Sequence, residues 1–142
     1  MHTHTILATG VFDILHDEHI QFLKRAKALG GKLVVGLESD VRVRQLKGVG
    51  RPINTQEVRV KNLEQLKLVD EVFILPEVFD KPEHHRAVLA AIKPDILAVS
   101  SHSPHLDAKR ALMRELGGSV VIVHQQNPAV STTLILAQQK SN

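Results

Sequence analysis

The 142-residue sequence contains no cysteine, no tryptophan and no tyrosine. The absence of cysteine excludes disulfide bonds, a thiolate nucleophile and a zinc site with cysteine ligands. Its aromatic residues are limited to four phenylalanines, whereas proteins that bind single-stranded nucleic acid commonly stack bases on aromatic side chains beside basic ones. We therefore expect no nucleic acid partner.

Long hydrophobic runs are also missing, because no apolar stretch approaches the roughly 18 residues of a membrane-spanning helix. Residues 1–5 lead directly into an apolar segment, so we expect no signal peptide, no membrane partner and a cytoplasmic location. The length suits a single domain over residues 1–142. The formal net charge is only +3, and its basic residues are spread along the chain, which favours a small anionic ligand.

Short apolar runs alternate with segments of helical periodicity, which is typical of an α/β fold with a parallel sheet. We expect strands at residues 5–8, 32–37, 71–75, 95–99 and 119–123. Helices are expected at residues 17–29, 55–68, 82–92 and 106–116, with a last helix from Ser131. Such helices would cover both faces of the sheet, and ligands of these sheets bind at the carboxyl ends of strands.

The segment from Gly10 to His19 reads G-V-F-D-I-L-H-D-E-H and joins the first expected strand to the first expected helix. Gly10 has no Cβ, so backbone amides can approach an anion closely. The unpaired N–H groups and the positive dipole end of the helix attract phosphate. His16 and His19 lie one helical turn apart and can face the same anion. The segment suits a polyphosphate, although a histidine pair at a helix start can also cap or pack locally.

These residues resemble the cytidylyltransferase-like nucleotidyltransferases, whose hallmark is a G-x-F-D-x-x-H-x-G-H segment. The matching residues are Gly10, Phe12, Asp13, His16 and His19. Three further stretches agree in order and spacing: L-K-G-V-G-R-P-I-N at 46–54, L-V-D-E-V at 68–72 and V-S-T-T at 130–133. The first stretch looks most like the adenylyltransferase domain of the heptose-phosphate pathway, with glycerol-3-phosphate cytidylyltransferase and archaeal-type FAD synthase as relatives.

The resemblance implies a Rossmann-like fold and an enzyme that transfers a nucleoside monophosphate unit from ATP or CTP to a sugar or polyol phosphate. An acceptor phosphate oxygen would attack the α-phosphorus and release pyrophosphate, without a covalent enzyme intermediate. His16 and His19 would bind the α- and β-phosphates, and Lys47, in a loop flanked by glycines, would close over the triphosphate. Family members often form homodimers.

The resemblance also implies further binding residues. Those for the nucleotide are Gly10, Val11, Phe12, Asp13, Ser131, Thr132 and Thr133, and Arg51 would bind the acceptor. Magnesium would be carried largely by the phosphates, with Asp13 as an outer-shell partner.

Plainer roles compete with several of these assignments. Asp13 could simply organise the turn before the helix, because Asx side chains bond to nearby backbone amides. Arg51 and Arg59 could bind substrate phosphate or pair with Glu57 and Glu64 along a helix. Phe12 suits the core, Lys47 alone would be a solvated surface residue, and Ser131 alone would be an ordinary N-cap.

Three positions depart from the family pattern. Glu18 stands where glycine is usual, and a carboxylate beside a triphosphate is repulsive by roughly 1 kcal/mol or more. Ala129 replaces a second usual glycine. Residues 100–105 read S-S-H-S-P-H where relatives carry a G-G-D type stretch that helps to contact the nucleotide. The preference for ATP or CTP therefore stays open.

Two other functions follow from these departures. Loss of activity would leave a catalytically inactive nucleotide-binding or interaction module. Alternatively, His102 and His105 could join His16 and His19 at neighbouring strand ends and ligate zinc or nickel.

Overall fold

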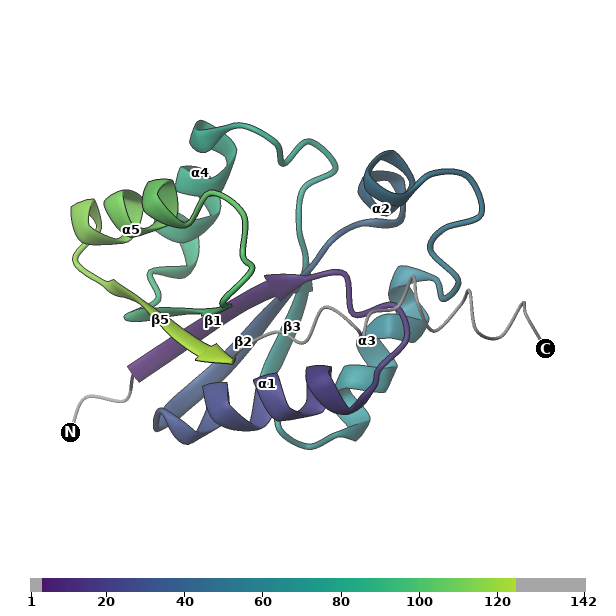
Figure 1. Cartoon of the computed structure of the whole chain (residues 1–142), viewed down its shortest axis with the longest axis horizontal. Coiled ribbons are helices and arrows are strands. Elements are labelled where there is room, and N and C mark those ends of the chain that lie inside the picture. The colour runs from purple at the N-terminus through teal and green to yellow at the C-terminus, as the bar shows by residue number, and fades with distance from the viewer. Residues whose placement is uncertain (1–3, 125–142) are drawn as a thin grey trace.

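The computed structural model describes residues 4–124. Within them, five parallel strands form one sheet: β1 (His4–Gly10), β2 (Gly31–Leu37), β3 (Glu71–Ile74), β4 (Ile96–Ser100) and β5 (Ser119–His124). Their order across the sheet is β3-β2-β1-β4-β5 (Figure 1). The chain builds outward from β1 to β3 and then returns to the other side of β1. Strand order therefore reverses between β1 and β4, and ligands of open parallel sheets bind at such a point.

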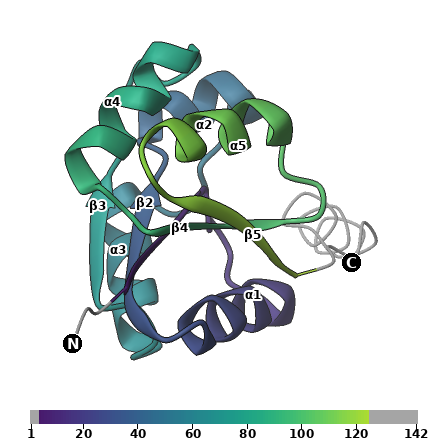
Figure 2. The same ribbon diagram turned by 90° about the vertical axis from the view of Figure 1, so that its left-hand side faces the viewer.

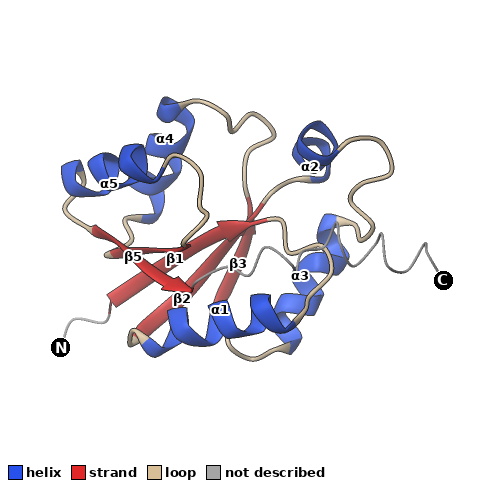
Figure 3. Cartoon of the chain, in the orientation of Figure 1, coloured by secondary structure: helices blue, strands red, loops and turns tan. Residues whose placement is uncertain are grey.

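Helices cover both faces of the sheet (Figures 2 and 3). One face carries α1 (Asp17–Ala28) and α3 (Gln56–Gln65), and the other carries α4 (Pro82–Ile92) and α5 (Leu106–Glu115). The short helix α2 (Asp40–Lys47) lies beyond the carboxyl end of β2. The Rossmann-like α/β sheet that the sequence predicts is confirmed.

Neighbouring residues of the central strand contribute to two separate cores. Ile6 and Ala8 of β1 pack in one buried cluster with Leu23 of α1. Leu7, which lies between them, packs in a second buried cluster with Leu112 of α5. Because successive side chains of a strand point to opposite faces, a sheet covered on both sides needs such unbroken apolar runs. The short apolar runs of the sequence are these strands.

The observed strands agree with the expected ones to within two residues at each end. The helix expected over residues 55–68 ends earlier, at Gln65, because Lys67 adopts a left-handed conformation with a φ of 57°. No helix among residues 4–124 combines the length and the apolar character that crossing a lipid bilayer requires.

Helix α2 is a departure from the sequence prediction. Lys47 was expected in a loop, but it is the last residue of α2, and Gly48 ends the helix with a φ of 97°. Ser39 caps the start of α2, since its hydroxyl accepts a hydrogen bond from the backbone N–H of Arg42 at 3.1 Å. The last expected helix, with Ser131, Thr132 and Thr133, lies outside the described residues.

Candidate active site

A cavity of about 660 Å³ lies at the carboxyl ends of β1 and β4, where strand order reverses. Its wall includes predicted site residues from three parts of the chain. These are Gly10, Val11, Phe12, His16, His19, Lys47 and Arg51. The structure therefore brings these residues together around one space, whereas Asp13 lies behind its wall.

The turn from β1 into α1 depends on Gly10 and Phe12. Phe12 adopts a φ of 49°, and its ring folds back so far that a Cβ on Gly10 would lie 2.9 Å from it. The Phe12 ring is buried and packs edge-on against the ring of His19, with centroids 5.2 Å apart. Phe12 is thus a core residue, as its plainer role suggested, and it also supports one of the site histidines.

His16 and His19 stack on each other with ring centroids 3.8 Å apart. His16 occupies the N-cap position of α1, yet its side chain makes no capping hydrogen bond. Burial lowers the pKa of His16, and burial together with the neighbouring His16 lowers the pKa of His19 to about 4. Both rings are therefore neutral at pH 7 and carry one N–H donor and one acceptor nitrogen each, but a hydrogen bond with the backbone of Ile14 already engages one ring nitrogen of His19.

Buried polar atoms without a hydrogen-bond partner gather around this cavity. Within residues 4–124 the side chains that carry such atoms are His16, His19, Glu38, Arg42 and Arg51. Every one of these residues lines the cavity. Because folded proteins satisfy nearly all buried polar groups, unsatisfied groups confined to one cavity indicate a binding site for a polar ligand.

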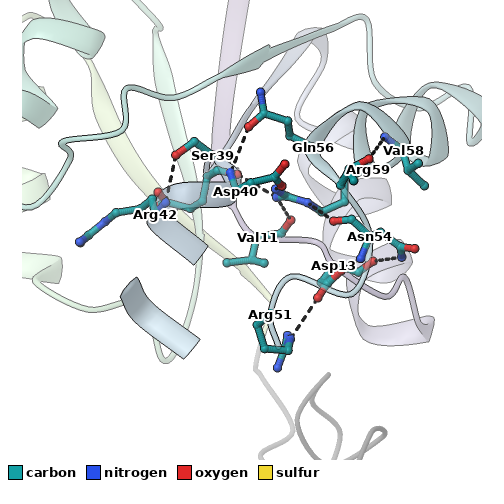
Figure 4. Close-up of polar contacts among 12 residues, drawn as sticks. Val11, Asp13, Ser39, Asp40, Arg42, Arg51, Asn54, Gln56, Val58 and Arg59 are labelled. Carbon is teal, nitrogen blue, oxygen red and sulfur yellow. Dashed lines mark hydrogen bonds and ion pairs between the residues drawn. The ribbon is translucent and has the colours of Figure 1, made fainter. Parts of the chain in front are cut away.

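Asp13 organises the loop opposite the turn (Figure 4). Its carboxylate accepts hydrogen bonds from the backbone N–H groups of Ile53 and Asn54, each at 2.8 Å, and from Nε of Arg51 at 3.1 Å. The Asn54 side chain donates in return to the Asp13 carbonyl at 2.7 Å. Asp13 has 1% of its surface exposed and holds the distant loop at residues 51–54, instead of the nearby backbone amides that the turn-organising role involves.

Arg51 is held by this pairing at the cavity wall. Its side chain is only 10% exposed, and its Nη2 has no partner. A guanidinium that is fixed through Nε and still has an unpaired donor is suited to an anionic group of a ligand. Lys47 also lines the cavity, but from an exposed position at the end of α2.

Arg59 fulfils neither role expected from the sequence. It is fully buried and donates to the carbonyls of Val11 and Glu38 and to the carboxylate of Asp40, at 2.8 to 3.0 Å (Figure 4). It also donates to the carbonyl of Asn54 at 3.1 Å. Arg59 therefore joins the chain segments that follow β1 and β2 instead of binding substrate or pairing along α3.

Glu18 lines the cavity and contacts Nε2 of His124, the last residue of β5. The other ring nitrogen of His124, Nδ1, lies 2.8 Å from Nη1 of Arg25. A guanidinium can only donate, so Nδ1 of His124 accepts, and the proton on Nε2 faces Glu18. The Glu18 carboxylate is thus bound by a buried histidine that the sequence did not single out.

The four-histidine metal site does not form. His102 and His105 line the same cavity as His16 and His19, but residues 4–124 contain no group of three or more His, Cys, Asp or Glu side chains placed to share a metal ion. Residues 100–105 instead form the part of the cavity rim that precedes α5.

Besides His124, the cavity residues that the sequence reasoning missed include Glu38, Arg42, His85 and Lys109. Glu38 follows β2 directly, so its place at a strand end was the available signal. The other three lie within helices, and only the fold shows which helical residues face the cavity.

Residues 7–138 match the model of a protein family described as "Cytidylyltransferase-like". The bifunctional protein HldE of Wolinella succinogenes is 47% identical over 92 residues, which cover 65% of this chain and 18% of that protein. HldE of Blochmanniella pennsylvanica is 34% identical over 139 residues, which cover 96% of this chain and 28% of that protein. The chain thus spans less than a third of the length of these curated relatives.

Solved structures show the same fold. A lipopolysaccharide core biosynthesis protein from Thermoplasma volcanium superposes with a TM-score of 0.70 at 30% identity, over 89% of this chain and 98% of that one. A pantoate-beta-alanine ligase from Francisella tularensis has a TM-score of 0.67 at 15% identity, over 97% of this chain and 69% of that one, and shows likeness of fold alone. Together with the family match over nearly the whole sequence, these findings show that the chain belongs to the cytidylyltransferase-like family.

Proposed function

We propose that the chain is a nucleotidyltransferase that transfers a nucleoside monophosphate unit from a triphosphate to a small phosphorylated acceptor and releases pyrophosphate. The observation that carries this proposal is the stacked pair of His16 and His19 at the start of α1, whose buried Nδ1 atoms have no partner and whose rings line the cavity. Family membership supports the reaction class, and the unpaired ring nitrogens in the cavity wall support a phosphate site there.

His16 binds phosphate as a neutral hydrogen-bond donor, whereas His19, whose ring already donates to the backbone of Ile14, donates from Nδ1 once a bound phosphate favours its protonated form. As the acceptor phosphate oxygen attacks the α-phosphorus, the bond to the β-phosphate breaks and its electron pair leaves with pyrophosphate. Imidazole N–H groups that already face the phosphates stabilise the charge that moves onto the leaving oxygens. The backbone N–H groups of the first turn of α1 add to this stabilisation. Arg51 and Lys47 contribute positive charge from the opposite wall.

Magnesium would enter with the triphosphate. Residues 4–124 offer no group of three acidic or histidine ligands, and Asp13 already accepts three hydrogen bonds. These residues fit a cation whose ligands are mainly phosphate oxygens and water. Such a cation would neutralise charge on the triphosphate, while the protein positions the phosphates.

The proposed nucleotide is ATP or CTP, and the proposed acceptor is a sugar or polyol phosphate. The likeness of residues 46–54 to heptose-phosphate adenylyltransferases favours ATP, whereas the altered residues 100–105 leave CTP open. A homodimer and a cytoplasmic location stay predictions of the sequence.

An inactive nucleotide-binding module is the second candidate, because Glu18 places a carboxylate in the cavity wall. The contact of Glu18 with His124 counts against strong repulsion of the nucleotide. The Glu18 carboxylate accepts a hydrogen bond from the His124 ring, and that ring also contacts Arg25. The carboxylate is thus partly compensated within the protein.

The test is pyrophosphate release with ATP, CTP, GTP and UTP, each with magnesium and a panel of sugar 1-phosphates and polyol phosphates. We expect turnover with one triphosphate and one class of acceptor, and its loss in His16→Asn. Tight triphosphate binding without turnover for any acceptor would support the inactive module. Absence of any triphosphate binding would overturn both candidates.

A further inference from the structure

The cavity has a second half, away from the two histidines. Its wall contains His85 of α4 and Lys109 of α5, two helices on the same face of the sheet, together with Glu38 and Arg42. Phe79 also lines it, and its buried ring lies 4.0 Å from the ring of His85, centroid to centroid. The phosphate chemistry proposed for His16 and His19 uses none of these side chains, so this half needs its own explanation.

Glu38 is fixed in the cavity wall by its backbone. Its N–H donates to the carbonyl of Gly10 at 3.0 Å, and its carbonyl accepts from the buried Arg59 at 2.8 Å. Its side-chain oxygen Oε2 is buried and has no hydrogen-bond partner. Burial raises the pKa of this carboxyl group. A buried carboxylate oxygen without a hydrogen-bond partner lowers the stability of the fold, and such groups are typical of ligand-binding sites.

Two cations share this half of the cavity with Glu38. Lys109 donates to the Ser103 hydroxyl at 2.8 Å, which leaves two of its three N–H groups for a ligand. Arg42 has a buried Nε without a partner. Among residues 4–124, no ion pair joins Glu38 to either cation. The N–H donors of Lys109 and Arg42 and the free oxygen of Glu38 are therefore not bound to each other and can bind different groups of one ligand.

Glu38, Arg42 and Lys109 together restrict which kind of ligand can bind here. Lys109 and Arg42 attract an anion, but a bare anion has no hydrogen to offer the free oxygen of Glu38 and is repelled by it. A ligand with both a phosphate and hydroxyl groups satisfies all three side chains. Such a ligand is what the reaction requires as acceptor.

We propose that this half of the cavity is the acceptor subsite, in which Lys109 and Arg42 bind the attacking phosphate and Glu38 accepts a hydrogen bond from an acceptor hydroxyl. The identification of the ligand as the acceptor rests on the proposed function. Glu38 lies beside Gly10, so a hydroxyl bound there places the adjoining phosphate near the phosphate site of α1. No proton transfer by these residues is needed, because the acceptor phosphate attacks as an anion.

The test compares two probes, glycerol 3-phosphate and propyl phosphate, which share a phosphate but differ in hydroxyl groups. Their dissociation constants are measured by calorimetry, with and without the α,β-methylene analogues of ATP and CTP. We expect the wild type to bind glycerol 3-phosphate about tenfold more tightly, as the loss of a hydrogen bond to a charged group predicts. Glu38→Met should bind the two probes equally, and Glu38→Gln, which keeps an acceptor oxygen, should fall between.

Lys109→Met should weaken both probes by about tenfold or more. The matched controls are Glu77→Gln and Arg110→Met, which alter exposed residues outside the cavity wall and should bind like the wild type. Equal binding of the two probes by the wild type, no binding of either, or unchanged binding in Glu38→Met and Lys109→Met overturns the subsite. Binding of glycerol 3-phosphate with the expected pattern but no binding of either triphosphate analogue overturns the proposed function and leaves a polyol-phosphate site that is not an acceptor subsite.

Discussion

The paired histidines are the residues on which turnover is expected to depend most. Replacement of His16 by Asn removes a ring that lines the cavity and packs mainly on His19. We expect a fall of about 100-fold or more in kcat, as for loss of a donor that stabilises transition-state charge, with a melting temperature close to that of the wild type. Pyrophosphate release and thermal unfolding provide the two measurements. Gln21→Asn, at an exposed position of α1 outside the cavity wall, is the control and should retain turnover.

The lowered pKa of His19 predicts acid sensitivity. The folded state binds its proton only near pH 4, whereas the unfolded chain binds it near pH 6.5. The unfolded state therefore takes up the proton first, and stability falls as the pH drops through this window, by roughly 3 kcal/mol in total. Urea unfolding of the wild type and His19→Gln at pH 7 and pH 4.5 measures this share. Parallel losses in both proteins would contradict the prediction.

Glu38 predicts the opposite pH dependence. Its raised pKa means that the folded protein holds the carboxyl proton more tightly than the unfolded chain does, so the ionised group costs stability above the ordinary carboxyl range. We expect Glu38→Gln to raise the free energy of unfolding at pH 7 by about 1 kcal/mol. The gain should shrink in acid, where the wild-type carboxyl is protonated. Glu77→Gln, at an exposed position, should change little at either pH.

At the level of elements, the loop at residues 51–54 depends on Asp13. The change Asp13→Asn leaves the Arg51 guanidinium without its carboxylate and weakens two backbone hydrogen bonds. We expect a loss of about 2 to 4 kcal/mol in unfolding free energy, measured by urea denaturation. Asp17→Asn, in the exposed first turn of α1, should cost less than about 1 kcal/mol. An unchanged stability with a shifted magnesium requirement would instead support the metal role.

The elements that follow from local patterns could be predicted from the sequence. Buried strands such as β1 and the amphipathic helix α1 show their periods directly, and their bounds agree closely with the structure. Helix α2 could not be found in this way, because V-R-V-R alternates like a strand while only Val43 is buried. The cap at Ser39 was the one local signal of a helix start.

The histidines of the site were found because motif and helix start coincide. Arg59 was misjudged because a buried arginine bonded to three carbonyls has no sequence signature. His124 was missed for a related reason, since its partners Glu18 and Arg25 lie about a hundred positions away. Contacts of this kind exist only once the sheet is assembled.

On the scale of the whole molecule, one cavity is lined from two independently packed faces of the sheet. The cavity wall includes His16 and His19 from the start of α1, on one face, and Lys109 from α5, on the other. The outer strand β5 lies next to α1 through His124, whose ring lies between Glu18 and Arg25. The unusual Glu18 thus has a structural function, in that it links the last described strand to the first helix.

Because of the contact between Glu18 and His124, the change Glu18→Gly should affect both the stability of the fold and the affinity for triphosphate. Because His124 is buried and would lose its acceptor, we expect unfolding free energy to fall by about 1 to 3 kcal/mol. Restoring the glycine of the family should at the same time leave triphosphate affinity similar or moderately stronger, since the lost carboxylate was already compensated. A double-mutant cycle with His124→Phe, read by urea unfolding, isolates the pair. Additive effects of the two changes would show that Glu18 and His124 do not support each other, and a large gain in triphosphate affinity would restore the repulsive role to Glu18.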